Sequence, residues 1–331
     1  MTRTYLTYSR DLGNFKHDLI GLSKRGLYGL RLINKGKSTE EFIDRIEEIL
    51  AYNRENNLNL EILIDLPGEK PLIGDIGNGL KIQKGDTYIL CDEKHDLAKN
   101  EIPTINFLAR IDRTKIFQGD LISIEDGEVE MNIVFMGDHS ITCVAQNSFL
   151  LTSNRSFNVK GNKLPAHPIS GHDQILLDKI KLLDLSKRTK ILVSFVTQAS
   201  QVKYVKDISP NFHVISKIEN VITEHDLEEI IKTSDGVMLG RGDLISTSRM
   251  SEVFPFQKSI IEKCKDLNKE LILATGLFGD LKNSNKPSIS DIMDFGFLRN
   301  LKVDAFLIAG SNAIHYPFET LNLITNYEEI Y

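Results

Sequence analysis

The stretch His213–Asp243, HVISKIENVITEHDLEEIIKTSDGVMLGRGD, indicates the fold because it contains a complete strand–helix–strand unit. The runs His213–Ile218 and Gly236–Gly240 are almost continuously apolar, which is typical of parallel strands covered on both faces. Between them, Thr223-Glu224-His225-Asp226 is a helix-start signal before the helical pattern of Leu227–Lys232. This order of elements predicts a parallel α/β sheet.

The first of these strands ends in charge. Lys217 and Glu219 are two residues apart, so both side chains point to the same side of the strand. Burying two charges beside an apolar run is costly unless the charges are paired or used. This strand end is therefore a candidate functional position.

The same alternation of strand and helix patterns extends over most of the chain. The other expected strands are Tyr5–Tyr8, Gly29–Asn34, Glu61–Leu66, Ile191–Val196, Glu270–Thr275 and Ala305–Gly310. The other expected helices are Thr39–Arg54, which follows the capping box of Ser38 and Glu41, and Leu176–Leu182, Phe256–Leu267 and Phe318–Tyr327.

The region after Asp65 lacks this alternation of strand and helix patterns. The Gly- and Pro-rich segment LPGEKPLIGDIGNG leads into short strand patterns joined by turns, with a hairpin signal at Asp126-Gly127. We therefore expect a first barrel part at residues 1–68, an inserted all-β domain at 69–162 and a second barrel part at 163–331. Without the insertion about 230 residues remain, close to the usual size of a (β/α)8 barrel. The predicted fold is an α/β TIM barrel with a small all-β lid domain inserted after strand 3; a doubly wound open sheet is the alternative.

Composition excludes several classes of function. A formal net charge of -6 gives no general attraction to nucleic acid or to anionic membranes, so neither is expected as a partner. Three well-separated cysteines, Cys91, Cys143 and Cys264, form neither a disulfide framework nor a zinc cluster and are expected to be reduced thiols. The N-terminus lacks a secretory signal pattern and no apolar run has membrane-spanning length, so the expected location is the cytoplasm.

Active residues of such barrels lie at the C-terminal ends of the strands, where polar groups converge in this sequence. The strand ends carry Arg31 and Asn34, Asp65, Ser194, Lys217 and Glu219, Arg241 and Asp243, and Thr275. Glu219 and Asp243 lie one β/α unit apart and are hard oxygen ligands that suit Mg²⁺, with Mn²⁺ as the alternative ion.

The neighbouring residues offer positive charge. Lys217 provides a point charge for a phosphate or enolate oxygen, and Arg31 provides a bidentate clamp for phosphate or carboxylate. Backbone N–H groups near Gly242 and Asp243 are candidates for holding an anion. The competing interpretation is that Lys217–Glu219 and Arg241–Asp243 are structural ion pairs at the rim. Their occurrence at adjacent strand ends favours function.

Several segments resemble, in order and spacing, the signature segments of the pyruvate kinase family. They are ISKIEN, SDGVMLGRGDL, LVSFV, LILATGL, VDAFLIAGSNAIHYPFETL, GLRLINKG, EILIDLPGEKPLIG and ISIEDGEVEM. The resemblance covers essentially the whole chain. In that family, phosphoenolpyruvate gives its phosphoryl group to ADP.

The resemblance implies a role for each candidate residue. Glu219 and Asp243 would hold Mg²⁺, Lys217 would contact the transferred phosphoryl group, Arg31 would bind phosphate and Thr275 would lie near the methylene carbon of the enolate. The catalytic set is then Lys217, Thr275 and Arg31. The substrate-binding set is Arg31, Ser194, Gly242, Asp243 and Thr275.

The sequence also departs from the family pattern. It stops near Tyr331, just after the barrel, so we expect the regulatory domain of the family to be absent. Ile33 and Lys35 stand where the family has potassium ligands, and Lys70 stands at a glutamate position near Asp65. Lys35, Asp65 and Lys70 are thus interpreted as replacing the monovalent-cation site, and potassium is not expected to be required.

Residues expected near the nucleotide are lost. The arginine expected near Leu72 is missing, SRDLGN replaces a Gly-Pro turn after strand 1, and Gly36 replaces a histidine. Thr197 stands where an arginine is usual, and Ser311 where a helix-capping glutamate is usual. The metal and enolate end of the site is retained, whereas the ADP end is eroded.

The first hypothesis is therefore a Mg²⁺-dependent pyruvate kinase-like phosphotransferase acting on phosphoenolpyruvate or pyruvate, with ADP or an altered acceptor. The alternatives are a Mg²⁺-dependent enolate-forming lyase, aldolase or decarboxylase on a 2-oxo acid, and an inactive pyruvate kinase-like binding protein. The expected partner is a small 2-oxo acid or phosphoenolpyruvate, and the nucleotide is left open. A homodimer through the barrel is the expected assembly.

Overall fold

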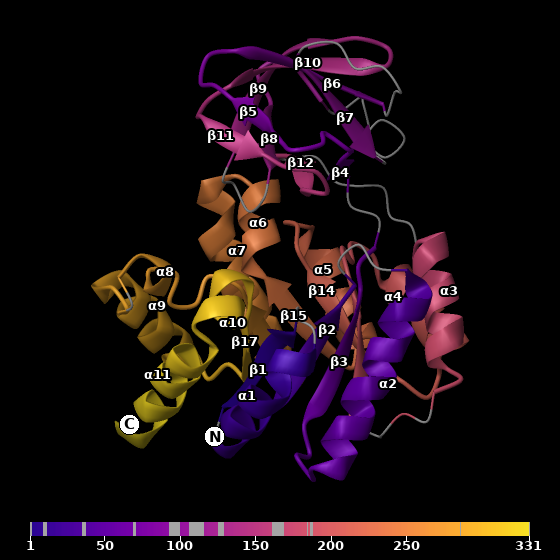
Figure 1. Cartoon of the computed structure of the whole chain (residues 1–331), viewed down its shortest axis with the longest axis vertical. Coiled ribbons are helices and arrows are strands. Elements are labelled where there is room, and N and C mark those ends of the chain that lie inside the picture. The colour runs from indigo at the N-terminus through magenta and orange to yellow at the C-terminus, as the bar shows by residue number, and fades with distance from the viewer. Residues whose placement is uncertain are drawn as a thin grey trace.

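A closed barrel of eight parallel strands forms the larger part of the computed structural model (Figure 1). The structure describes residues 2–8, 12–34, 38–68, 71–92, 100–105, 116–124, 129–160, 169–183, 185, 188–284 and 286–330. The strands follow one another around the barrel in chain order and are β1 (Arg3–Tyr8), β2 (Gly29–Ile33), β3 (Glu61–Leu66), β13 (Thr189–Val193), β14 (His213–Ile218), β15 (Gly236–Gly240), β16 (Glu270–Ala274) and β17 (Ala305–Ile308). The predicted barrel is confirmed and the open-sheet alternative was wrong, because β1 pairs with both β2 and β17.

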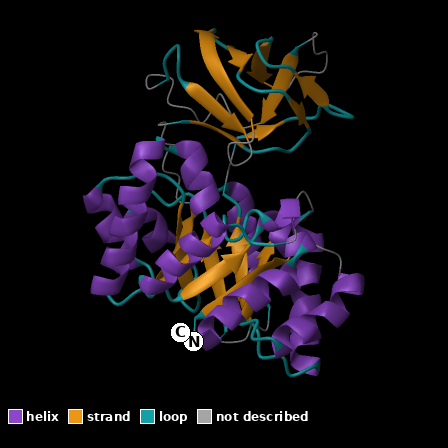
Figure 2. Cartoon of the chain, turned by 90° about the vertical axis from the view of Figure 1, so that its left-hand side faces the viewer, coloured by secondary structure: helices purple, strands orange, loops and turns teal. Residues whose placement is uncertain are grey.

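Helices surround this barrel, as Figure 2 shows. Several begin at a serine that accepts a hydrogen bond from the backbone three residues later, including Ser38 at the predicted capping box. The helices are α1 (Leu12–Lys24), α2 (Thr39–Glu55), α3 (Gly171–Ile180), α4 (Ala199–Ile208), α5 (Glu224–Thr233), α6 (Arg241–Thr247), α7 (Met250–Asp266), α8 (Leu281–Ser284), α9 (Ile289–Asn300), α10 (Gly310–His315) and α11 (Pro317–Ile330).

The barrel interior has an apolar middle layer between two charged ends. Leu63, Leu192 and Ile215 belong to the buried cluster inside the barrel. Because side chains alternate along a strand, residues two positions away on the same strands share this inward face. Toward the N-terminal end, Lys190 Nζ lies 2.9 Å from both a Glu61 and a Glu270 oxygen. Toward the C-terminal end, the same face presents Asp65, Ser194 and Lys217. The apolar layer thus separates a structural ion network from the candidate site.

The chain between β3 and β13 forms a second, all-β unit with its own hydrophobic cluster. Its described strands are β4 (Leu72–Ile73), β5 (Leu80–Ile82), β6 (Thr87–Asp92), β7 (Glu101–Ile105), β8 (Leu121–Ile124), β9 (Val129–Met136), β10 (Ser140–Ala145), β11 (Phe149–Leu151) and β12 (Phe157–Val159). They form a seven-stranded and a two-stranded sheet, and β8 pairs antiparallel with β9. The predicted Asp126-Gly127 turn lies outside the described residues.

The β unit rests on the barrel through α6. Figures 1 and 2 both show it beyond the C-terminal ends of the barrel strands. Buried Asn158 of β12 donates a hydrogen bond from Nδ2 to Ser246 Oγ of α6 at 3.2 Å. The insertion therefore contacts α6, whose first turn carries the candidate metal ligand Asp243.

Four of the expected strands extended too far at their C-terminal ends. For two of them the backbone conformation of a following residue gives the reason. Strand β16 ends at Ala274 because Thr275 adopts φ +70°, and β13 ends at Val193, just before Phe195 at φ +53°. Strand β17 ends at Ile308 because α10 begins at Gly310, and β2 ends at Ile33.

Within the described residues, no helix is both long enough and apolar enough to span a membrane. Cys91, Cys143 and Cys264 are buried and form no disulfide. Burial raises the pKa of the Cys143 and Cys264 thiols to about 12, so neither is activated as a nucleophile.

Candidate active site

Five of the predicted residues meet at the C-terminal end of the barrel. The Lys217 ammonium of β14 lies 2.8 Å from Ser194 Oγ, 3.2 Å from an Asp65 oxygen and 3.2 Å from Glu219 Oε1. Arg31 of β2 also donates to Asp65, with Nε 2.7 Å from Asp65 Oδ2. Neighbouring parallel strands bring these residues together although they are far apart in the sequence.

The charges in this cluster are mutually compensated. Arg31 and Lys217 face Asp65 and Glu219, and the Lys217 and Glu219 side chains are only 6% and 2% exposed. Burial alone would raise the pKa of the Asp65 carboxyl, but the opposing charges of Arg31 and Lys217 outweigh burial and hold that pKa below its ordinary value. Asp65 therefore remains an anion that orients two cations.

Glu219 is held at its carboxylate and at its backbone by groups that the sequence did not suggest. The backbone N–H of Phe195 donates to Glu219 Oε2 at 2.9 Å, and the Thr247 hydroxyl donates to the Glu219 backbone carbonyl at 2.8 Å. A Cβ on Gly240 would lie 2.9 Å from Glu219 Cγ and 3.2 Å from Oε1. Only glycine leaves the carboxylate in this position without displacement.

Asp243 lies three residues after Gly240 in the chain. Residues 241–243 are not the end of a strand, as the sequence suggested, but the first turn of α6, which begins after Gly240. Gly242 is buried in that turn, and Asp243 is partly exposed. The turn that carries the second predicted metal ligand thus starts beside the first one.

Arg241 does not lie in the rim ion pair with Asp243 that the alternative interpretation required. Its Nη1 lies 2.9 Å from Asp294 Oδ2, and its Nε donates to the Thr275 backbone carbonyl at 2.9 Å. Thr275 has φ +70°, a conformation that costs a β-branched residue about 1–3 kcal/mol. The structure therefore connects the α6 turn to the strained Thr275 backbone.

The structure assigns Thr197 to helix capping. Its backbone N–H donates to Gln201 Oε1 at 2.8 Å, at the start of α4. This position offers no charge for a nucleotide phosphate, in keeping with the loss of the expected arginine. The predicted cation-site residues Lys35 and Lys70 lie outside the described residues, whereas Asp65 is engaged by Arg31 and Lys217.

One buried carboxyl near this end of the barrel was also missed. Asp173, in the first turn of α3, is 1% exposed, and its Oδ2 accepts a hydrogen bond from the Ser170 backbone. Its pKa is raised by burial and, to a lesser extent, by the negative charge of Asp65. The Ser-Gly-His-Asp capping box was the available sequence signal, but it predicts a helix start rather than a buried acid.

The pyruvate kinase barrel-domain family model matches residues 13–321. The pyruvate kinase of Thermococcus litoralis is 26% identical over 316 residues, which cover 93% of this chain and 65% of that protein. The pyruvate kinase of Thermotoga maritima is 29% identical over 287 residues, covering 85% of this chain and 60% of that protein. The chain spans about half to two thirds of the length of the curated relatives it matches.

A solved structure shows the same fold. The crystal structure of the pyruvate kinase from Pyrobaculum aerophilum superimposes with a TM-score of 0.78 at 22% sequence identity. The match covers 98% of this chain and 72% of that one.

Proposed function

The chain belongs to the pyruvate kinase family, and from that premise we propose that it is a Mg²⁺-dependent phosphotransferase acting on phosphoenolpyruvate or pyruvate. The observation that carries the proposal is the Lys217 ammonium, held between Asp65, Ser194 and Glu219 at the end of the barrel. Phosphoryl transfer needs positioned charge more than covalent chemistry. A buried, oriented ammonium beside two carboxylates meets that need.

The donor set fits a magnesium ion. No group of three or more His, Cys, Asp and Glu side chains is arranged for a metal ion in the part of the chain that is described. Glu219 and Asp243 would therefore supply two oxygens and leave other positions to water and substrate, as Mg²⁺ usually requires. When bound, the ion would neutralise charge on the phosphoryl and enolate oxygens. The absent side chain of Gly240 supports this assignment, because it lets the Glu219 carboxylate keep its position at the end of the barrel.

The other residues take their roles from position and chemistry. The Lys217 ammonium stabilises negative charge on the phosphoryl group as that group is transferred from the enolate oxygen. Arg31, oriented by Asp65, binds the same phosphoryl group. Ser194 orients Lys217 through its 2.8 Å contact. Thr275, held by Arg241, handles the proton at the methylene carbon, directly or through water.

The test is formation of ATP and pyruvate from phosphoenolpyruvate and ADP in the presence of Mg²⁺. Lys217→Met should lower kcat by about 10²–10³-fold, the usual effect of removing one electrostatic donor. Glu219→Ala should abolish phosphate transfer, because it removes a proposed Mg²⁺ ligand. Lys232→Met, which removes an exposed lysine on α5, should leave the rate unchanged. Absence of phosphate transfer to every nucleoside diphosphate tried would refute the phosphotransferase assignment.

The position of Thr197 favours a second candidate, an enolate-forming lyase, aldolase or decarboxylase on a 2-oxo acid. Thr197 is bound to Gln201 and offers no cation where a nucleotide phosphate is expected. That activity would exchange the C3 protons of pyruvate with solvent in the absence of nucleotide. Exchange without phosphate transfer would select this candidate. Stabilisation by oxalate and Mg²⁺ without exchange would instead select a binding protein.

We also propose that the protein does not require potassium. Replacement of the ion by Lys35 and Lys70 beside Asp65 stays a prediction, and it requires activity that does not change between sodium and potassium buffers. A rate that rises steeply with potassium would contradict it.

A further inference from the structure

The loop that follows β16 departs from ordinary backbone conformation at three residues. Thr275, Gly276 and Phe278 have φ values of +70°, +74° and +51°. Glycine adopts such values freely, but a β-branched threonine and a bulky phenylalanine adopt them only where the surrounding structure imposes them. Backbone strain of this kind is concentrated at active sites, because it can pre-organise a reacting group. The loop begins at Thr275, the residue to which proton transfer is assigned above.

Side chains from two helices hold this loop through its carbonyl oxygens. Arg241 of α6 donates from Nε to the Thr275 carbonyl at 2.9 Å. Asn312 of α10 is only 6% exposed and donates from Nδ2 to the Leu277 and Phe278 carbonyls, both at 2.8 Å. An amide nitrogen has two donor hydrogens, so Asn312 can hold both carbonyls at once. The conformation of residues 275–278 is therefore imposed by α6 and α10 rather than by the local sequence.

Arg241 is itself fixed in place. Its Nη1 lies 3.1 and 2.9 Å from the two carboxylate oxygens of Asp294 on α9, and its side chain is only 11% exposed. The guanidinium also lies against Gly276, where an added Cβ would be 3.4 Å from Nη2. Because the planar guanidinium presents its donors in a rigid geometry, the pairing with Asp294 sets the direction in which Nε–H points toward Thr275. Arg241 thus connects Asp294 to the Thr275 backbone.

We propose that Arg241 and Asn312 are positioning residues that act through Thr275, an inference that rests on the proton-transfer function proposed above. In that step C3 of the enolate takes up a proton. The electron pair of the C2–C3 double bond forms the new C–H bond, and the enolate oxygen becomes the carbonyl oxygen of pyruvate. The Thr275 hydroxyl, or a water bound to it, supplies the proton and is reprotonated by solvent. A displacement of about 1 Å can cost such a group about 10²-fold in rate.

The test compares two rates in the full chain with Mg²⁺. The first is exchange of the C3 protons of pyruvate with deuterated water, followed by proton NMR with and without ATP. The second is phosphate transfer from phosphoenolpyruvate to a nucleoside diphosphate. Arg241→Met and Asn312→Ala should each slow exchange about tenfold or more, because Thr275 is displaced. Each should keep phosphate transfer within about threefold, because the charges that stabilise the phosphoryl group are unchanged and the enolate can be protonated in solution.

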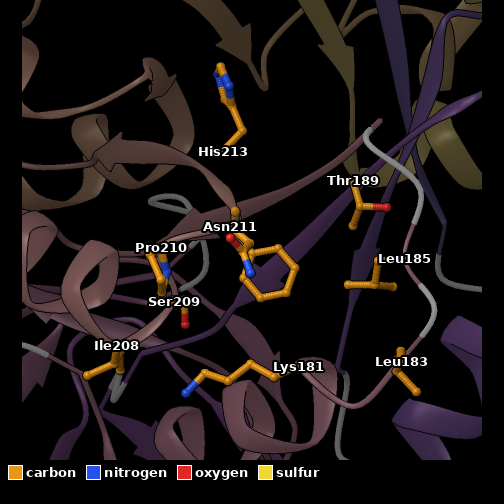
Figure 3. A pocket seen from close by; sticks show the side chains of 10 residues that line it. Lys181, Leu183, Leu185, Thr189, Ile208, Ser209, Pro210, Asn211 and His213 are labelled. Carbon is orange, nitrogen blue, oxygen red and sulfur yellow. The ribbon is translucent and has the colours of Figure 1, made fainter.

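Thr275→Val removes the hydroxyl and provides the baseline. In that background neither Arg241→Met nor Asn312→Ala should slow exchange further, because a residue that acts only through Thr275 has no effect once the hydroxyl is gone. The matched control is Asn211→Ala, which should leave both rates unchanged. Asn211 is exposed and lines a cavity of about 740 Å³ at the N-terminal end of the barrel, beside the first residue of β14 (Figure 3). The rise in Tm on adding Mg²⁺ should persist in both variants.

A loop contact that only stabilised the fold would lower both rates in parallel, and that result would overturn the proposal. A further loss of exchange in the Thr275→Val background, or loss of the magnesium response, would also overturn it. If the wild type exchanges protons but transfers no phosphate, the phosphotransferase assignment fails, while exchange alone still decides the roles of Arg241 and Asn312. A wild type that does neither would overturn both.

Discussion

Lys217 should weaken the binding of a magnesium ion to Glu219, because both positive charges interact with the same carboxylate. Lys217→Met removes the ammonium that lies 3.2 Å from both an Asp65 and a Glu219 oxygen, within a cluster that is almost fully buried. Asp65 keeps Arg31 as a partner, and Glu219 keeps the Phe195 backbone N–H. Glu219 therefore loses its neighbouring ammonium and becomes the main source of destabilisation.

The magnitude follows from burial. Removing one partner of a buried ion pair costs about 3–5 kcal/mol. At about 2 °C per kcal/mol for a chain of this size, the Tm without metal should fall by roughly 6–10 °C. Adding Mg²⁺ at ten times its Kd stabilises the wild type by about 1.4 kcal/mol. The variant should gain more than this from the same Mg²⁺ concentration, since its Glu219 no longer shares its charge with Lys217.

The assay is thermal unfolding of both proteins over a magnesium titration, which needs no enzymatic activity. Lys232→Met is the matched control and should follow the wild type, because its pairs with Glu228 and Glu229 are exposed. The double variant Lys217→Met/Glu219→Gln should recover much of the lost stability and lose the response to Mg²⁺. An equal or smaller magnesium response in Lys217→Met would refute the reasoning.

Three further predictions test other parts of the structure. Burial raises the pKa of Asp173, so the folded state binds that proton more tightly than the unfolded state and loses stability as the pH rises above about 4. In urea unfolding, Asp173→Asn should increase the free energy of unfolding relative to the wild type more at pH 7 than at pH 4. An equal increase at both pH values would contradict this prediction. Gly240→Ala should displace the Glu219 carboxylate, cost about 1–3 kcal/mol and weaken the magnesium-dependent rise in Tm, whereas Gly279→Ala, which meets open space, should do neither. The expected homodimer would bury the exposed apolar faces of α7 and α9, where the rings of Phe254 and Phe297 lie 6.0 Å apart, so Phe254→Asp should halve the mass measured by light scattering. A wild type that is already monomeric would contradict the last prediction.

Most of the fold could be predicted because period and capping are local properties. The strands at Glu61–Leu66, His213–Ile218 and Gly236–Gly240 have the expected bounds, and the capping box at Ser38 forms. At β13 and β16 the expected strand was too long because a residue adopts a conformation that its type disfavours. Thr275 has a positive φ, which its β-branched side chain opposes, so nothing in its own segment predicted the end of β16.

In the candidate site, the positions of the residues could be predicted from the sequence but their partners could not. Alternation along one strand placed Lys217 and Glu219 on the same side, and barrel geometry placed Arg31, Asp65 and Ser194 at the same end of the barrel. The actual partners could not be predicted, because they depend on distances between strands. Arg241 contacts Asp294 rather than Asp243, and Phe195 contributes a backbone N–H that carries no side-chain signal.

The sequence by itself determined the eight strands, their inward-facing residues and the end of the barrel where charge collects, because strand periodicity and parallel pairing follow from local pattern. Only the tertiary structure decided which charges compensate one another and which carboxyl has its pKa raised by burial. Burial and pairing are properties of neighbours brought together by folding, and they set the pKa of Asp65 and Asp173 in opposite directions although both are aspartates near the same end of one barrel.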